Sequence, residues 1–204
     1  NPKKIKEQHV LSRKGFYDWL ATNLQIDGIE KTERDTAFDD LDAYRSGGIR
    51  LSYTSLTEPI AGLKSGILLE AGFDTVTPNM ERTISSWALD YALEREVPGI
   101  INNQALAIAC YHPGYTFVEK LQTIATKFRK EQEGAAKQLN YMRQYYDIYC
   151  LLNHPKVKSF IGTLEYEVHK QKRFPKIDLQ VPILENEAFL LSDPGIRADF
   201  TKRY

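Results

Sequence analysis

Lys120 stands on the polar side of a predicted helix that follows a Pro-Gly turn, in the segment YHPGYTFVEKLQTIATKFRK at 111–130. Two stripes recur at helical spacing after this turn, one apolar and one polar, two residues out of phase. The apolar stripe consists of Val118, Leu121, Ala125 and Phe128, and the polar stripe of Lys120, Thr123, Lys127 and Lys130. Two residues correspond to about 200° around a helix, so the sequence predicts a basic face backed by a buried one. Such a face suits a nucleoside triphosphate or a nucleic-acid backbone; an ordinary solvated helix surface is the alternative.

Glu70 is the one acidic residue in an otherwise apolar strand candidate, GILLEAGF at 66–73. A buried carboxylate is costly unless a metal, a cation or several hydrogen-bond donors compensate it. Strand alternation places Gly72 on the same face as Glu70, which leaves space beside the carboxylate. Acids on neighbouring strands hold Mg²⁺ in phosphoryl-transfer sites, whereas an edge strand would leave Glu70 exposed. Both interpretations stay open.

Arg143 and Asp147 are four residues apart in YMRQYYDIYCLL, a helix candidate that is apolar on almost every side. They share a face of this helix, where they could form a structural ion pair. Alternatively, Asp147 orients Lys120 or accepts a proton.

Two other sets of polar residues are predicted to have no catalytic role. Residues 39–48 combine the spacing Asp40-x-Asp42 with a later Ser-Gly-Gly, but a nucleotide-binding glycine turn precedes its D-x-D strand, and here the order is reversed. We therefore predict a solvated loop over 39–48. The four histidines have no metal-ligand spacing, no serine or cysteine lies in a nucleophile-elbow context, and Cys110 and Cys150 form no CxxC.

The elements that would position these residues are strands in the first half and helices in the second. Strand patterns occur at 49–54, 67–73 and 105–111, and the first two are expected to pair antiparallel. Helix patterns occur at 13–25, after Thr77-Pro78, from Gly114 onward, at 139–152 and at 157–168. The sequence thus predicts an α+β fold in which a small mixed β-sheet is followed by a C-terminal helical bundle. We expect an α/β region at 1–112 and a helical region at 113–204 that carries the lysine and the aspartate.

Composition and charge fit a folded protein with an anionic partner. Of the 204 residues, 42% are hydrophobic and 26% are charged, close to the average for globular domains. Residues 1–100 contain 12 basic and 16 acidic side chains, and residues 101–204 contain 15 and 11, so the second half suits a polyanion. No segment approaches the roughly 18 apolar residues of a membrane span, and the polar start NPKKIKEQH lacks the apolar part of a secretory signal. A cytoplasmic protein without a membrane partner is expected.

Three segments in this order, GILLEAGFD, YHPGYTFVEKLQTI and MRQYYDIYCLL, resemble successive motifs of the AbiEii toxin family, and RTISSW at 82–87 and NEAFLL at 186–191 extend the likeness. AbiEii members are nucleotidyltransferase-fold toxins of bacterial toxin-antitoxin and abortive-infection systems. The resemblance implies that Glu70 is the second-motif acid and a metal ligand, Lys120 the third-motif lysine and Asp147 the fourth-motif aspartate, preceded by Arg143. Lys120 and Arg143, together with Lys127 of the basic face, are then the candidate nucleotide-binding residues.

The resemblance also implies an activity. A nucleoside monophosphate would pass from a nucleoside triphosphate to an acceptor, which is tRNA in some relatives, and a cognate antitoxin would be a partner. The family's first motif, a Gly-Gly or Gly-Ser turn followed by a D-x-D strand, is not found in these 204 residues, and we expect that an N-terminal truncation removed it. Mg²⁺ would need those acids besides Glu70, so these 204 residues alone are expected to be inactive or weakly nucleotide-binding, and activity is predicted for the intact protein. The alternative is a non-catalytic nucleotide- or RNA-binding or antitoxin-interaction module with a degenerate transferase fold.

Overall fold

The computed structural model describes residues 2–58, 61, 65–137 and 141–204. The chain divides into two compact units, Asn1–Thr75 and Val76–Tyr204. The predicted α+β fold, with a nucleotidyltransferase-like order of strands first and helices after, is confirmed. The strands form two antiparallel sheets, where the sequence predicted one mixed sheet.

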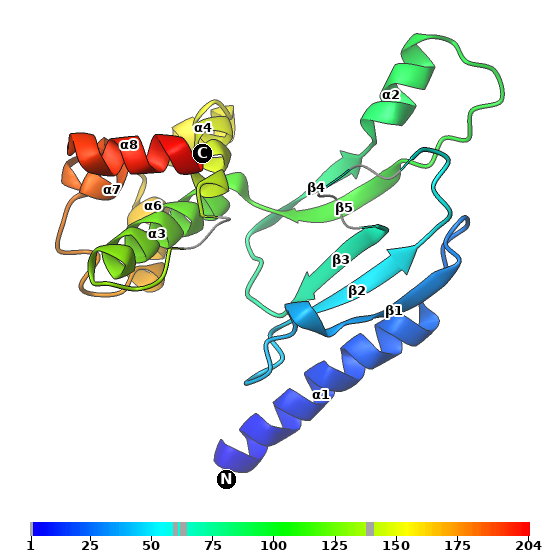
Figure 1. Cartoon of the computed structure of the whole chain (residues 1–204), viewed down its shortest axis with the longest axis horizontal. Helices are drawn as coiled ribbons and strands as arrows, with labels where there is room; N and C mark the ends of the chain where they lie inside the picture. The colour runs from blue at the N-terminus through cyan, green and yellow to red at the C-terminus, as the bar shows by residue number, and fades with distance from the viewer. Residues whose placement is uncertain (1, 59–60, 62–64, 138–140) are drawn as a thin grey trace. The chain divides into compact units, whose positions relative to one another are not determined.

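The first unit is a three-stranded antiparallel sheet with one helix along it (Figure 1). Its elements are α1 (Pro2–Asn23), β1 (Lys31–Asp35), the 3-10 turn η1 (Thr36–Phe38), β2 (Ser46–Ser52) and β3 (Ile67–Gly72). The strand order is β1-β2-β3, and β2 pairs antiparallel with β3 so that Ile49 lies opposite Leu69. The predicted pairing of these two strands is therefore confirmed.

Tyr17 fixes α1 on this sheet. Its side chain is fully buried, and its ring packs on Gly47, where an added Cβ would come within 2.9 Å of ring atoms. Its hydroxyl donates a hydrogen bond to the carbonyl oxygen of Ala71 at 3.3 Å. Phe16 and Trp19, the two other aromatic residues in this part of α1, are 38% and 56% exposed.

The prediction of a solvated loop over 39–48 is wrong in two places. Residues 46–48 begin strand β2, and both glycines are buried because the ring of Tyr17 and the turn around Phe38 leave no room for a Cβ. The Asp39 side chain is only 3% exposed and forms an ion pair with Arg34 at 2.6 Å. Asp40 accepts hydrogen bonds from three backbone N–H groups of the turn, which lower the pKa of its carboxyl. These acids therefore shape the turn.

The second unit begins with a two-stranded antiparallel sheet and continues as a helical bundle. Strand β4 (Asn79–Ile84) pairs with β5 (Ala105–Tyr111), and α2 (Trp87–Glu94) connects them in sequence. The bundle contains α3 (Pro113–Gln132), α4 (Arg143–Leu152), α5 (Pro155–Phe160), α6 (Leu164–Arg173), the 3-10 turn η2 (Ile183–Glu185), α7 (Glu187–Leu190) and α8 (Pro194–Arg203). The change from strand to helix thus falls at residues 112–113. The boundary along the sequence between the two compact units is at residues 75–76 instead.

Two predicted helices differ from the structure for local reasons. The helix expected directly after Thr77-Pro78 begins later, because residues 79–84 pair with β5 and the Ser86 hydroxyl caps α2 by accepting the Leu89 N–H at 3.1 Å. The helix expected at 157–168 is two helices, because Gly162 has φ +82° and Thr163 starts α6 as its N-cap. The helix expected at 139–152 is α4; residues 139 and 140 lie outside the described residues.

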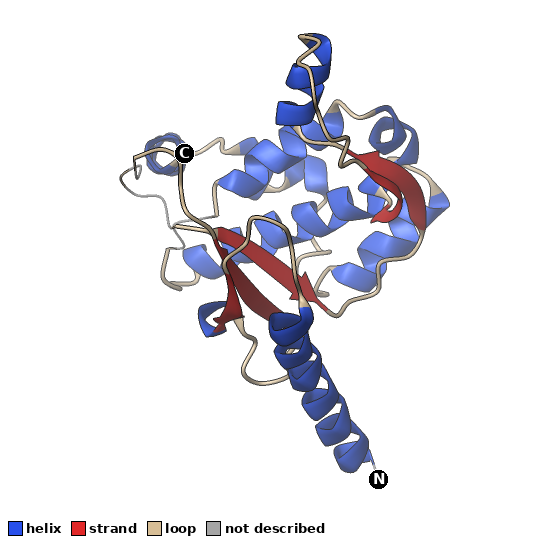
Figure 2. Ribbon diagram, turned by 90° about the vertical axis from the view of Figure 1, so that its right-hand side faces the viewer, coloured by secondary structure: helices blue, strands red, loops and turns tan. Residues whose placement is uncertain are grey.

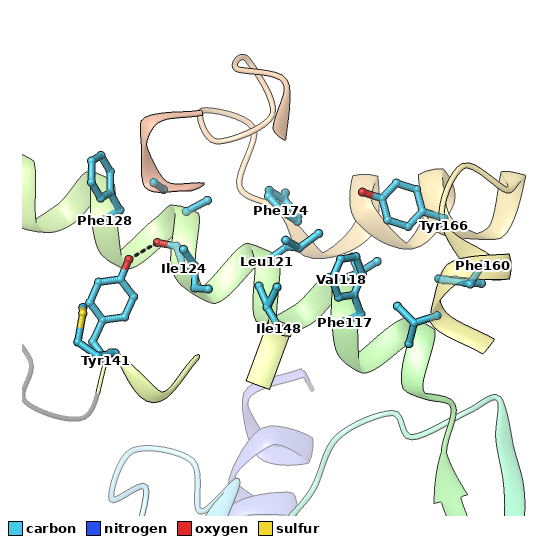
Figure 3. Close-up of a cluster of buried hydrophobic side chains, with 14 of the residues drawn as sticks. Phe117, Val118, Leu121, Ile124, Phe128, Tyr141, Ile148, Phe160, Tyr166 and Phe174 are labelled. Atoms are coloured by element: carbon cyan, nitrogen blue, oxygen red, sulfur yellow. Dashed lines mark hydrogen bonds between the residues drawn. The ribbon is translucent and has the colours of Figure 1, made fainter. Parts of the chain in front are cut away.

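Helices α4, α5, α6 and α7 pack against α3. Figure 2 shows the helices of this unit in blue and the strands in red. Its predicted apolar stripe is confirmed as buried, and partners from the neighbouring segments close over it (Figure 3). These partners include Tyr141, Ile148, Phe160, Tyr166 and Phe174. The Tyr141 hydroxyl donates to the carbonyl oxygen of Ile124 at 2.9 Å, which fixes the start of α4 against the middle of α3.

Candidate active site

Lys120 and Asp147 form an ion pair between α3 and α4, with 2.8 Å between Nζ and Oδ2. The same ammonium donates a hydrogen bond to Oε1 of Gln144 at 2.9 Å. Gln144 is only 7% exposed, so its amide is held in place, while the Lys120 and Asp147 side chains are 30% and 38% exposed. The ammonium is therefore fixed by two acceptors and still accessible to a ligand.

The packing of α4 explains why these two acceptors face α3. Gln144 and Ile148 are four residues apart and both buried, so one side of α4 lies against the core. The Tyr145 hydroxyl donates to the carbonyl oxygen of Ala188 at 2.7 Å and ties the helix to α7, while burial raises the pKa of Tyr145 to about 12. Asp147 then lies three residues after Gln144, beside Lys120.

Lys127 and Arg143 add positive charge around the pair. Lys127 is seven residues from Lys120, about two turns along the same side of α3. Burial first, and then the charges of Arg143 and Lys120, lower the pKa of Lys127, and its Nζ lies 5.9 Å from the ring centre of Tyr141. Arg143 is exposed at the first residue of α4. A bound anion would relieve the mutual repulsion of these cations.

The geometry of this helix pair shows which partner Asp147 contacts. Among the described residues, Asp147 pairs with Lys120 and not with Arg143, so it is placed to orient the lysine. The basic face of α3 is only partly a solvated surface, because Lys120 and Lys127 are half-buried and Lys130 is exposed.

Glu70 lies in the first unit, where it is exposed on β3 at one end of the strand order. It stands opposite Gly48 of β2, and Asp35 of β1 stands on the other side of Gly48, so the two acidic side chains share a face of the sheet. Asp35 is engaged by Arg50 at 2.5 Å. The convergence of Glu70 with Lys120 and Asp147 stays a prediction.

The described carboxylates do not complete a magnesium site. Within residues 2–58, 61, 65–137 and 141–204, there is no group of three or more His, Cys, Asp or Glu side chains that could hold a metal ion. A Mg²⁺ ion on Glu70 would therefore need further oxygen ligands.

Gln144 is the residue of this site that the sequence analysis missed. Its signal was a polar side chain at helical spacing between Tyr141 and Ile148, in a stripe that is otherwise apolar. A buried amide needs hydrogen-bond partners, and such a residue therefore points to a nearby polar group, here the ammonium of Lys120.

A polar cluster around Glu119 holds the first part of α3 against β5 and α6. Oε1 of Glu119 accepts a hydrogen bond from the Tyr111 hydroxyl at 3.0 Å and lies 3.2 Å from Nε2 of His169 and 3.5 Å from Nε of Arg173. Burial lowers the pKa of His169, although Glu119 acts in the opposite direction. These contacts hold Glu119, the residue next to Lys120, and so help to orient the side chain of Lys120 on α3.

In the part of the chain that is described, no helix has both the length and the apolar character needed to span a bilayer. No curated protein and no solved structure matches the chain. A family model does match, described as "Nucleotidyl transferase AbiEii toxin, Type IV TA system", over residues 8–203. This range covers nearly the whole chain and includes both partners of the ion pair between α3 and α4. The chain belongs to the nucleotidyl transferase AbiEii toxin family of type IV toxin-antitoxin systems.

Proposed function

We propose that the intact protein transfers a nucleoside monophosphate from a nucleoside triphosphate to a hydroxyl group of an acceptor RNA, with tRNA as the acceptor to test first. The observation that carries this proposal is the ammonium of Lys120, held between Asp147 and the buried amide of Gln144. Lys127 and Arg143 add the further cations that a triphosphate requires. Family membership supports a transferase of this class.

The proposed reaction is a displacement at the α-phosphorus. The acceptor hydroxyl oxygen forms a bond to this phosphorus, the bond from phosphorus to the bridging oxygen breaks, and pyrophosphate leaves. The hydroxyl proton passes to a carboxylate or to water. Lys120 neutralises the negative charge that grows on the phosphates in the transition state, and Asp147 keeps the ammonium in position for this role. Because the ammonium is already oriented before substrate binds, little reorganisation is needed.

The family and the sequence also support an antitoxin partner, a metal ligand and a site of action. An antitoxin is the expected partner, since the family belongs to toxin-antitoxin systems. We also propose Glu70 as a metal ligand, with Mg²⁺ bound only when further carboxylates accompany it, and a cytoplasmic site of action. The proposed displacement contains no step on the metal, because Glu70 alone does not form a metal site among the described residues.

A second candidate function is a non-catalytic module that binds nucleotide, RNA or an antitoxin through the same basic surface. The observation that favours it is the lack, in the described part of the chain, of three clustered metal-binding side chains. Such a module would bind triphosphate or RNA at the cations around Lys120 but would not break a phosphate bond.

Incubation of the intact protein with tRNA, Mg²⁺ and each labelled ribonucleoside triphosphate in turn separates the two candidates. The transferase proposal predicts label that stays with the RNA after the free nucleotide is removed. Binding of triphosphate or RNA without any incorporated label would instead support the non-catalytic module. Co-expression with the antitoxin should then restore growth to cells that the toxin arrests.

A further inference from the structure

A second cationic cluster lies where β4 meets the start of α5. Nη2 of Arg82 donates to the sulfur of Met80 at 2.7 Å, and Nζ of Lys156 donates to the same sulfur at 3.4 Å. The two cationic nitrogens are therefore at most about 6 Å apart, the sum of these two distances. Both side chains are exposed. A thioether is a weak acceptor. Nη1 of Arg82 also donates to the carbonyl oxygen of Glu81 at 3.3 Å, and the described residues give the other donors of these two groups no strong partner.

Two histidines beside these cations are oriented as hydrogen-bond donors. Nδ1 of His112 accepts the Gly114 N–H at 3.1 Å, and Nδ1 of His154 accepts the Lys156 N–H at 3.2 Å. In a neutral imidazole whose Nδ1 is an acceptor, the ring proton is on Nε2. Within the described ranges of the chain, neither Nε2 has a hydrogen-bond partner, so both N–H groups are available.

The surroundings of His112 are uniformly positive. Its burial, followed by the charges of Lys156, His154 and Arg82, lowers the pKa of His112, and no acidic side chain contributes to this change. Two cations and two N–H donors thus share one region of the surface, which is the donor set that binds phosphate oxygens. We call Arg82, His112, His154 and Lys156 the phosphate cluster.

The phosphate cluster lies along α3 from the candidate active site. His112 caps α3 eight residues before Lys120, which corresponds to about 12 Å along the helix axis. Helix α4 runs back along α3, from Tyr141 at Ile124, past Asp147 at Lys120, towards His154 near His112. In double-stranded DNA the phosphates of one strand advance by about 3.4 Å each along the axis, so about 12 Å corresponds to a few nucleotides of a nucleic-acid strand. One strand can therefore pass both places.

We propose that the phosphate cluster binds the phosphodiester backbone of the acceptor RNA and leads its reactive end to Lys120. This inference rests on the proposed function, because it names where the acceptor of that reaction binds. The nucleoside triphosphate binds to the cations around Lys120, and the RNA backbone binds to Arg82 and Lys156. The RTISSW segment, which carries Arg82, thereby gains a role in binding the acceptor.

The test compares two double variants of the full chain that lose the same charge. In Arg82→Gln with Lys156→Gln the phosphate cluster loses both cations, and in Lys176→Gln with Lys202→Gln two exposed lysines elsewhere in the same unit are removed. Binding of fluorescently labelled tRNA is measured by anisotropy at several salt concentrations. Binding of a fluorescent triphosphate analogue is measured in parallel, and unchanged thermal melting shows that each variant is folded.

We expect the cluster variant to bind RNA roughly tenfold more weakly and the control variant to bind it within about twofold of the original chain. The slope of log affinity against log salt should fall by about 1.4 to 1.8 in the cluster variant, for two lost phosphate contacts. Triphosphate binding should stay unchanged in both. Equal RNA binding by the two variants would overturn the inference, as would weaker triphosphate binding in the cluster variant or an original chain that binds no RNA.

The proposed function can fail separately from this inference. RNA binding is measured without any transfer of nucleotide, so the cluster can be confirmed in a chain that incorporates no label. Conversely, label incorporation that depends on Lys120 but is indifferent to Arg82 and Lys156 at limiting RNA concentration would keep the reaction and remove the cluster.

Discussion

At the scale of single residues, the ion pair of Lys120 and Asp147 matters more for chemistry than for stability. Both side chains are about one-third exposed, and pairs of this kind contribute about 0 to 1 kcal/mol to folding because water and salt screen them. Gln144 is different, since its amide is buried and its oxygen would lose the ammonium that donates to it if Lys120 were removed. Asp147 and Gln144 thus hold the ammonium of Lys120 in place and leave it accessible to a ligand.

Asp147→Asn should abolish transfer while leaving the fold intact. The amide has no charge to orient Lys120, so we expect at least about a hundredfold loss of incorporation, whereas the melting temperature should change by no more than about 2 to 4 °C. Incorporation and thermal melting are measured on the same preparation. A collapse of the melting temperature would assign Asp147 a structural role instead.

Gln144→Met should lower kcat without a matching change in the KM for triphosphate. Methionine fills a similar volume but offers Lys120 only a weak thioether acceptor in place of the amide oxygen. Loss of a strong hydrogen bond to a charged group corresponds to about a tenfold slower reaction. Steady-state kinetics on the folded variant provide the measurement. Unchanged kcat would show that the amide only fills space.

At the scale of elements, α3 depends on one buried carboxylate near its C-terminal part. Asp178 accepts hydrogen bonds from the Thr126 hydroxyl and from Nε of Arg129, both at 2.6 Å, and its side chain is only 2% exposed. These bonds tie the segment after α6 to the face of α3 that does not carry Lys120. The register of α3 in the bundle therefore depends on Asp178.

Asp178→Ala should lower the free energy of unfolding by about 2 to 3 kcal/mol, because it removes a buried acceptor and leaves Arg129 and Thr126 without it. Glu133→Ala is the matched control. Glu133 also pairs with Arg129, at 2.9 Å, but its side chain is 54% exposed, so its loss should cost less than about 0.5 kcal/mol. Urea denaturation of both variants checks this order, and equal losses would contradict it.

At the scale of the whole molecule, two half-buried or buried histidines make stability depend on pH. Burial lowers the pKa of His112 and of His169 below the ordinary value of 6.5. Between the lowered native pKa and 6.5, the unfolded chain binds more protons than the folded one, so the free energy of unfolding falls as pH falls. Above pH 6.5 this contribution is fully present.

The free energy of unfolding should therefore be smaller at pH 5.5 than at pH 7.5, a range above the ordinary pKa values of carboxyl groups. Urea denaturation at the two pH values measures the difference. In His169→Gln, the side chain can still hydrogen-bond Glu119 but does not titrate, so the difference should shrink. A free energy of unfolding that does not change between the two pH values would contradict this account.

The sequence predicted the elements wherever a single pattern dominated. The alternation at 49–54 and 67–73 predicted β2 and β3, and the apolar stripe from Val118 to Phe128 predicted the buried side of α3. The sequence pattern predicted the wrong structure at 79–84 and in part of 39–48, because contacts with residues distant in the sequence determine the structure there. Pairing with β5 makes residues 79–84 a strand, and Tyr17, about thirty residues earlier, buries Gly47.

The candidate site could be predicted only in part for the same reason. Helical spacing placed Lys120 and Lys127 on one face and Arg143 and Asp147 on another. That Asp147 meets Lys120 depends on how α4 lies against α3, which the bond from Tyr141 to Ile124 and the burial of Ile148 determine. Spacing marks Gln144 as a polar residue in an apolar stripe, but no spacing within either helix shows that its amide meets Lys120.

The most direct test of the central claim is nucleotide incorporation into tRNA by the intact protein and by its Lys120→Ala and Lys130→Ala variants, with equal melting temperatures as the condition for comparison. Lys130 lies on the same helix but is exposed, so it controls for the loss of one positive charge. The account predicts incorporation by the unsubstituted intact protein and by Lys130→Ala, and none by Lys120→Ala. Full incorporation by Lys120→Ala, or no incorporation by the unsubstituted intact protein, would contradict it.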